Sequence, residues 1–356
     1  MHASTTFSIS KVPPRDVLKI NTNTQDLCDV AKNTLRYLNL GSNYDKAVIH
    51  SDKLAEFGIQ HSDVKRTLAY ICKITDEDKA THQNRLTDFS FLSKSFDFYR
   101  ITSDTKHAEK LSKNKPLLKN LSSDKVLMTK YYVHLANGST TKSNRTPYAL
   151  YGLPFDETHL TIEQANLKAN RLTRYKFGKQ AILKGALAEE QLAPPLVYLS
   201  REDIESALLQ GTVVVNVDNT KRVFNVHRNN NIAYDRAIKP YHQERYWYFK
   251  EVDGVLGYGK DANQKITVLP EVTFAGDIFQ IGLGPLVFAK FDLSAHSEYR
   301  LAVMADTGGA FENNLYQLDY LAGSYPGINA YYEANRHLPD YIDAWFMVLK
   351  KEIAHD

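Results

Sequence analysis

From residue 125 onward the chain is a succession of short apolar or alternating segments, each bounded by residues that form turns. Gly, Pro, Asn and Asp punctuate the segments, while Val, Ile, Tyr and Phe fill them, which is the pattern of β-strands. Many short strands at regular spacing are typical of β-barrels and disfavour a doubly wound parallel sheet. We expect strands at 126–133, 148–153, 213–217, 223–226, 246–249, 266–269, 277–281, 286–289, 301–304 and 341–349, and helix within 161–187.

The chain before residue 125 has a different spacing of apolar residues. Apolar residues recur at helical spacing through much of 24–112, so we expect helices there, one of them capped at Ser62-Asp63. Residues 86–100 are rich in aromatic side chains and fit neither helix nor strand clearly. The Lys-rich stretch 104–124 is expected to be a solvated helix or loop. The expected fold class is therefore mostly β with N-terminal helices.

Length and charge narrow the possible functions. The 356 residues are enough for about two domains, and 44 basic against 41 acidic side chains leave a net charge of +3. This balance disfavours nucleic acid as a partner. The sequence has no apolar run of about 18 residues, so no membrane-spanning segment is expected. Its first residues also lack the apolar core of a signal peptide.

The sulfur and imidazole residues give no sign of a metal centre. Cys28 and Cys72 both lie in helix-like segments, where one disulfide and two buried thiols are both compatible with the sequence. No cysteine or histidine spacing suggests zinc. We therefore expect neither a metal nor a cofactor.

The candidate site begins at Asp306, which follows the apolar run from Leu301 and precedes a predicted Gly308-Gly309 turn. A second carboxylate, Asp319, interrupts the next alternating segment, where burial of its charge is costly. Carboxylates held rigidly at strand ends are good candidates for general acid and base catalysis. Asp306 has an alternative role as a simple cap of its turn. The pair fits acid-catalysed bond cleavage, and the spacing alone does not choose the reaction.

An ordered series of motifs resembles the membrane-bound lytic transglycosylase A family, whose members carry a double-psi β-barrel and cleave peptidoglycan. The series covers about residues 125–350 and is more specific than any one of its segments. It consists of Thr129-Lys-Tyr131-Tyr132, Arg174 with Gly185-Ala186-Leu187, Gln210-Gly211, Asn229 to Tyr234, Asp277 to Gly284, Asp306 to Phe311, Asp319, and Trp345 to Lys350.

The resemblance implies an architecture and a set of site residues. Residues 1–128 with 255–356 would form a double-psi β-barrel domain with N-terminal helices, and 129–254 an inserted second β-barrel domain, with a cleft between the two. Asp319 would be the catalytic acid and then base, with Asp306 ordering its surroundings. The residues expected to bind substrate are Thr129, Tyr131, Gln210 and Tyr234.

The implied activity is lytic cleavage of the bond between N-acetylmuramic acid and N-acetylglucosamine, which forms a 1,6-anhydro product. The partner would be the peptidoglycan glycan strand, met by a monomer in the periplasm or facing the cell wall. The chain departs from the family between Tyr234 and Tyr246, where a helical insertion of the family is absent. Two alternatives therefore stay open, namely a glycoside hydrolase on the same barrel and a non-catalytic glycan-binding module.

Overall fold

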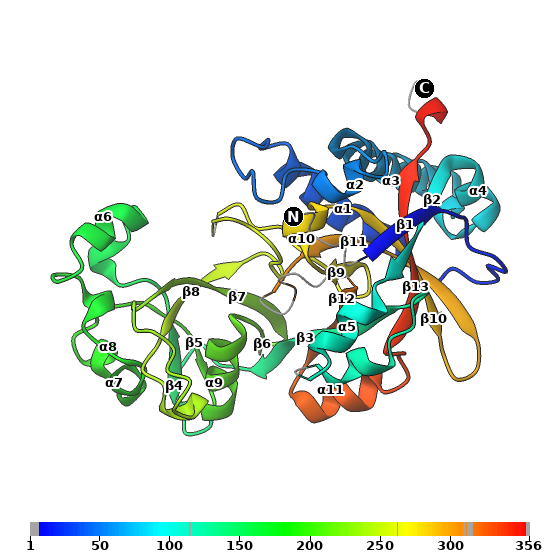
Figure 1. Ribbon diagram of the computed structural model, residues 1–356. Coiled ribbons are helices and arrows are strands. Elements are labelled where there is room, and N and C mark those ends of the chain that lie inside the picture. Colours follow the sequence, from blue (N-terminus) through cyan, green and yellow to red (C-terminus); the bar gives the residue numbers. More distant parts are fainter. Residues whose placement is uncertain (1–6, 114, 262, 309–310, 312–315, 354–356) are drawn as a thin grey trace. The chain divides into compact units, whose positions relative to one another are not determined.

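The computed structural model describes residues 7–113, 115–261, 263–308, 311 and 316–353. Contacts within the chain divide it into two compact units. The first unit comprises residues 1–132, 257–323 and 332–356, and the second unit comprises 133–256 and 324–331. Figure 1 labels the helices and strands of both units. The fold is mostly β with helices, as predicted.

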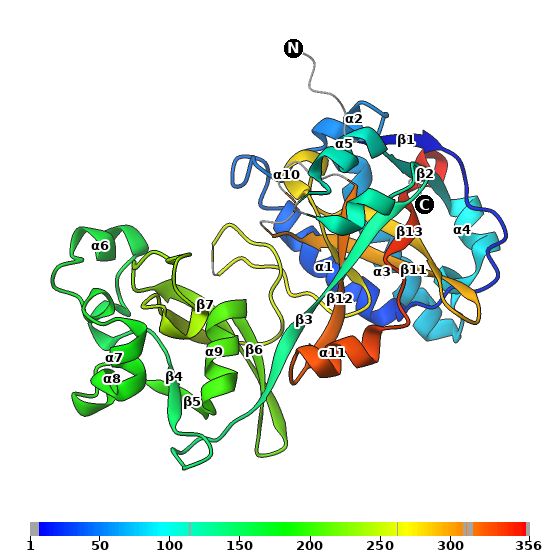
Figure 2. The same cartoon turned by 60° about the horizontal axis from the view of Figure 1, so that its bottom comes forward.

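The strands of the first unit form a sheet that closes on itself. Along the sheet the order is β1-β2-β13-β10-β11-β9-β12-β3, and β13 also pairs with β3. Six strands, from β13 round to β3, therefore form a closed barrel, and Figure 2 displays β12 beside β3. The bounds are β1 Phe7–Lys11, β2 Phe96–Ser103, β3 Val126–Asn137, β9 Thr273–Ala275, β10 Leu286–Asp292, β11 Ser297–Asp306, β12 Gln317–Tyr325 and β13 Tyr341–Leu349.

Two helices, α1 (Thr24–Leu38) and α3 (His61–Thr81), pack against each other and onto this sheet. The Asn23 side chain caps α1 by accepting hydrogen bonds from the next two free backbone N–H groups. A disulfide between Cys28 and Cys72 joins the two helices, which decides between the two possibilities left open by the sequence. The other helical segments are α2 Asp52–Ala55, η1 Arg85–Thr87, α4 Phe89–Ser95, α5 Thr105–Leu111, η2 Pro116–Asn120, α10 Ile278–Ile281 and η6 Lys351–Ile353.

Residues 96–103, which overlap the aromatic-rich stretch left unassigned from the sequence, are strand β2, where aromatic residues pair with β13. Two local predictions in this unit are wrong. The segment 277–281, expected as a strand, is the short helix α10, because buried Ile278 and Ile281 have helical spacing while Phe279 is exposed. Residues 266–269 form no strand, although Ile266 exchanges loop hydrogen bonds with residues 257–258.

The cap of α3 also differs from the prediction. The helix begins at His61, so Asp63 lies inside its first turn, where its carboxylate accepts a hydrogen bond from the Gln60 backbone N–H at 3.0 Å. Asp63 therefore does stabilise the start of the helix, but as the third helical residue of a capping box.

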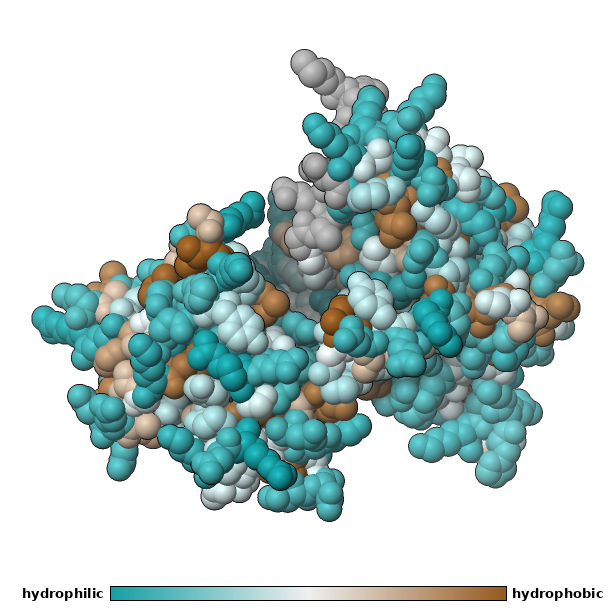
Figure 3. All heavy atoms as spheres, turned by 90° about the horizontal axis from the view of Figure 1, so that it is seen from below, coloured by the Kyte–Doolittle hydropathy of each residue, from teal (hydrophilic) through white to brown (hydrophobic). Residues whose placement is uncertain are grey.

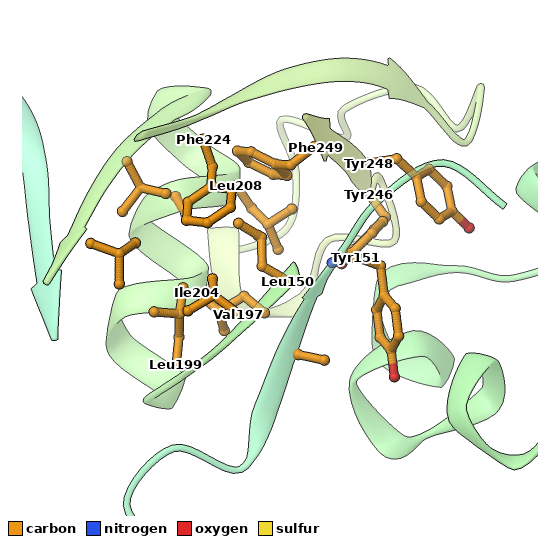
Figure 4. Close-up of a cluster of buried hydrophobic side chains, with 14 of the residues drawn as sticks. Leu150, Tyr151, Val197, Leu199, Ile204, Leu208, Phe224, Tyr246, Tyr248 and Phe249 are labelled. Carbon is orange, nitrogen blue, oxygen red and sulfur yellow. The ribbon is translucent and has the colours of Figure 1, made fainter. Parts of the chain in front are cut away.

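The second unit has its own core around helix α9 (Arg201–Gln210). Figure 4 displays Ile204 and Leu208 of this helix among Leu150, Val197 and Phe224. The strands are β4 Tyr148–Tyr151, β5 Pro195–Leu199, β6 Thr212–Val217, β7 Thr220–Asn229 and β8 Trp247–Val252. The remaining helical segments are η3 Phe155–Glu157, α6 Ile162–Leu167, η4 Thr173–Tyr175, α7 Lys179–Lys184, α8 Ala186–Glu189 and η5 Pro240–His242. Helix α11 (Ile328–Asn335) begins in the second unit and ends in the first.

The strands of the second unit form two sheets. The end of β3 continues the larger sheet by running parallel to β6, and β7 and β8 follow in antiparallel order. The smaller sheet is the antiparallel pair β4 and β5. A bridge between Ser139 and Tyr198 links the chain after β3 to β5. The helix predicted within 161–187 is present as several short pieces, one of which ends at Gly185 with a positive φ of 114°.

Polar and charged side chains cover most of the face drawn in Figure 3, and apolar side chains lie on it in small groups. Within the described residues, no helix has the length and apolar character needed to cross a membrane.

Candidate active site

Asp306 lies at the end of β11, after five consecutive buried residues, Leu301 to Ala305. The strand runs parallel to β9, but the register skips Ala305, so Asp306 pairs with Ala275. Such an irregularity re-aims the side chain that follows it. Gly257 packs against the same point, since a Cβ there would lie 2.9 Å from the Ala305 carbonyl oxygen. The close approach of this loop requires glycine.

Both carboxylate oxygens of Asp306 accept hydrogen bonds. The Tyr131 hydroxyl donates to Oδ2 at 2.9 Å, and the Thr307 backbone N–H donates to Oδ1 at 2.8 Å. The Thr307 hydroxyl in turn donates to the Gly276 carbonyl oxygen at 2.8 Å. Burial raises the pKa of Asp306 to about 6, while these two hydrogen bonds and the charge of Lys265 oppose the rise. Asp306 therefore holds Thr307 in place, while Gly309 of the predicted turn lies outside the described residues.

Asp319 lies on β12, on the other side of β9, and is half-buried. Its register partner is also Ala275. Among the residues that the structure describes, Oδ1 of Asp319 is buried and has no hydrogen-bond partner. Burial raises the pKa of Asp319 to about 6, and the charge of Asp306 adds to the rise. A hydrogen bond from Thr129 and the charge of Lys130 act in the opposite direction.

Thr129 is oriented toward this carboxylate by its neighbours. The Gln317 side-chain N–H donates to the Thr129 hydroxyl oxygen at 2.9 Å, which leaves the hydroxyl proton for another acceptor. The Leu318 carbonyl oxygen is 3.5 Å away, at the limit of a hydrogen bond. Thr129 therefore donates to Asp319 as its better acceptor.

Of the two carboxyl groups, Asp319 is the better suited to hold a proton. Two donors stabilise the charged form of Asp306, whereas Oδ1 of Asp319 has none among the described residues. Tyr131 stays a neutral donor, since burial and the charges of Asp306 and Asp319 raise its pKa well above the usual value. The first unit thus brings together four of the predicted site residues, Thr129, Tyr131, Asp306 and Asp319.

The other two predicted residues belong to the second unit. The Gln210 side-chain oxygen, at the end of α9, accepts a hydrogen bond from the His134 backbone N–H at 2.9 Å. This contact ties the end of α9 to β3, which is a structural role. Tyr234 is 42% exposed and lines a pocket that also contains Trp247. Trp345, the first residue of the closing motif of the resemblance, is buried in the first unit.

Sequence reasoning missed two cations that act on the carboxylates, Lys130 and Lys265. Lys130 lies between the predicted site residues Thr129 and Tyr131 on β3, so its position next to them in the sequence could have identified it. Lys265 lies in a loop far from Asp306 in the sequence, and nothing local points to it. Within the described residues, no group of three or more His, Cys, Asp or Glu side chains is arranged to hold a metal ion.

Comparison with solved structures gives matches that span nearly the whole chain. Escherichia coli MltA with bound chitohexaose aligns with a TM-score of 0.56 and 16% identity, over 98% of this chain and 95% of that chain. A membrane-bound lytic murein transglycosylase from Agrobacterium tumefaciens aligns with a TM-score of 0.55 and 15% identity, over 98% of both chains. The chain has an MltA-like fold.

A third structure, of MltA from Neisseria gonorrhoeae, aligns with a TM-score of 0.53 and 17% identity, over 91% of this chain and 89% of that chain. No protein-family model matches the sequence, and no curated protein sequence matches it. The likeness to MltA is therefore one of three-dimensional fold. The sequence identity is too low to show that the activity is shared.

Proposed function

We propose that this protein is a peptidoglycan lytic transglycosylase that uses Asp319 as its single acid and base. The observation that carries the proposal is the state of Asp319 itself. Its carboxyl group has a pKa raised to about 6 and a buried oxygen without a partner among the described residues. A group of this kind is suited to hold a proton and to give it to a substrate oxygen.

In the proposed reaction, protonated Asp319 donates its proton to the glycosidic oxygen between N-acetylmuramic acid and N-acetylglucosamine. The bond from C1 of the muramic residue to that oxygen breaks, and the N-acetylglucosamine chain leaves with the proton. The carboxylate of Asp319 then takes the proton of the muramic C6 hydroxyl as its oxygen attacks C1. A 1,6-anhydro ring forms, Asp319 is again protonated, and no water is consumed.

Asp306 and Tyr131 have supporting roles in this proposal. The negative charge of Asp306 disfavours ionisation of Asp319 and so keeps its carboxyl group protonated. The Tyr131 hydrogen bond, with the Thr307 backbone N–H, fixes that charge in place. Thr129 orients the catalytic carboxyl group from the neighbouring strand.

The two alternatives are less well supported. A hydrolase would use a second carboxylate to activate water, and Asp306 is the available one. Both Asp306 oxygens already accept hydrogen bonds from the protein, so part of their capacity to accept a hydrogen bond from an attacking water is used. A non-catalytic glycan-binding module would not account for the raised pKa values of Asp306 and Asp319, which are typical of a catalytic site.

The partner in this proposal is the peptidoglycan glycan strand. Support comes from the fold shared with MltA, which was crystallised with chitohexaose, itself a chain of β-1,4-linked N-acetylglucosamine. We also propose a monomer located in the periplasm or facing the cell wall. The disulfide between Cys28 and Cys72 agrees with an oxidising compartment of this kind.

The test is digestion of purified sacculi. Wild-type protein should release soluble muropeptides, and Asp319→Asn should release almost none while keeping its fold by circular dichroism. If Asp319→Asn digests sacculi at the wild-type rate, the catalytic assignment is wrong.

A further inference from the structure

The second unit contains a pocket of about 210 Å³ whose lining combines charge with exposed apolar surface. It is formed by residues of α7, α9, β8 and the segment between β7 and β8. The residues that define its chemistry are Lys179, Glu205, Leu209, Tyr234, Arg245 and Trp247. The volume is below that of sites for drug-sized ligands and suits a fragment of about one amino acid.

An ion pair whose partners are satisfied forms part of the pocket lining. Lys179 Nζ lies 2.5 Å from Glu205 Oε2, and both side chains are buried. Lys179 also donates to the Pro240 carbonyl oxygen at 2.9 Å, and Arg201 donates to the other Glu205 oxygen at 2.7 Å. Two cations therefore face one carboxylate, so the negative charge of Glu205 is fully compensated.

Among the residues that the structure describes, Arg245 is the cation of this pocket that forms no ion pair. Its guanidinium carbon lies 4.8 Å from the centre of the Trp247 ring, a cation–π contact that helps to hold the group in place. Among the described residues, its buried Nε atom has no hydrogen-bond partner. A buried guanidinium N–H without a partner adds to the cost of leaving this cation unpaired. A carboxylate is the matching ligand, because it can accept two hydrogen bonds from one guanidinium.

The rim supplies apolar contact for the rest of such a ligand. Leu209 is 65% exposed and Tyr234 is 42% exposed, and both line the pocket. Exposed apolar side chains beside an oriented cation suit a small amphipathic anion more than a neutral sugar.

We infer that this pocket binds the carboxylate of a short peptide, and that in peptidoglycan this peptide is the stem attached to the glycan strand. The carboxylate would bind Arg245, and its residue's small side chain would contact Leu209 and Tyr234. The identity of the peptide rests on the proposed function, whereas the recognition of a peptide carboxylate does not. The second unit would then bind the peptide, and Asp319 of the first unit would act on the sugar.

The experiment is calorimetric titration of the full protein with the tetrapeptide L-Ala-γ-D-Glu-L-Lys-D-Ala, and with the same peptide after amidation of its carboxyl groups. The acid peptide should bind wild type, and Arg245→Gln should weaken binding about tenfold or more, as expected for a lost charged hydrogen-bond pair. Arg222→Gln is the matched control, because Arg222 pairs with Glu251 outside the pocket and should leave binding unchanged.

Three outcomes would overturn the inference, namely no binding to wild type, equal binding of the amidated peptide, and unchanged binding by Arg245→Gln. If Arg245→Gln does not fold, as judged by its thermal unfolding, the comparison of acid and amidated peptides on wild type still decides. The probe contains no glycan, so binding is measured independently of cleavage. A protein that cleaves sacculi without binding the peptide would contradict the inference and leave the proposed function intact.

Discussion

Asp306 and Asp319 lie on the two strands that flank β9, and each is in register with the same residue, Ala275. Register partners on neighbouring strands have their side chains on one face of the sheet. Two strand spacings of about 4.8 Å place the two Cα atoms about 10 Å apart. The two carboxyl groups are therefore close enough for the charge of Asp306 to raise the pKa of Asp319.

This coupling predicts the effect of Asp306→Asn. Removal of the charge should lower the pKa of Asp319, so the loss of activity at high pH should begin at a lower pH than in wild type. Profiles of kcat/KM against pH for both proteins measure the shift. An alkaline limb that moves to higher pH, or stays in place, would argue against electrostatic support of Asp319 by Asp306.

The wild-type profile is itself a prediction. Catalysis needs Asp319 in its protonated form, and its pKa is about 6. The value of kcat/KM should therefore fall about tenfold for each pH unit well above 6, because the protonated fraction falls by that factor. An enzyme whose activity rises steadily from pH 6 to 8 would not use a carboxylic acid of this kind.

The same pKa value makes a prediction about stability. The folded pKa of Asp319 is raised above the ordinary value of 3.8, so the folded state binds more protons than the unfolded state between about pH 4 and 6. The free energy of unfolding therefore falls as pH rises through this window. Asp319→Asn removes the buried charge and should stabilise the protein by about 1–2 kcal/mol at pH 7.

Urea unfolding at pH 4 and pH 7 checks this claim. The stabilisation should be large at pH 7 and small at pH 4, where the wild-type carboxyl group is mostly neutral. Asp292→Asn is the control, since neighbouring hydrogen bonds lower the pKa of Asp292 and its replacement should destabilise at pH 7. Destabilisation at pH 7 by Asp319→Asn would contradict the assigned cost of burying this group.

The disulfide between Cys28 and Cys72 should contribute measurably to stability. It closes a loop with a sequence separation of 44 residues. A cross-link of that length constrains the unfolded chain by up to about 4 kcal/mol, and measured effects are commonly 2–4 kcal/mol. Thermal unfolding of Cys28→Ser/Cys72→Ser against wild type tests the expected loss, and a reductant should affect only the wild type.

Sequence patterns predicted much of this fold because local rules apply to most of its strands. The closing strand, 341–349, and the strand that delivers Asp306 were both visible as apolar runs. Residues 277–281 were misread because a short apolar run fits a strand and a helix equally well. Only the burial of Ile278 and Ile281 against exposed Phe279 separates the two.

The site itself was only partly predictable. The motif identified Asp306 and Asp319, and the resemblance added Thr129 and Tyr131. The skipped register at Ala305, which sets the direction of Asp306, depends on pairing with β9 and has no local signal. The influence of Lys265 likewise depends on a distant loop.

The most direct test of the central claim is to digest purified sacculi in water enriched with heavy oxygen and to weigh the muropeptides. Lytic transglycosylation by Asp319 uses the muramic C6 hydroxyl in place of water. We therefore expect anhydromuramic ends without heavy oxygen, and their near absence with Asp319→Asn. Reducing ends that carry one heavy oxygen would identify a hydrolase and contradict the account.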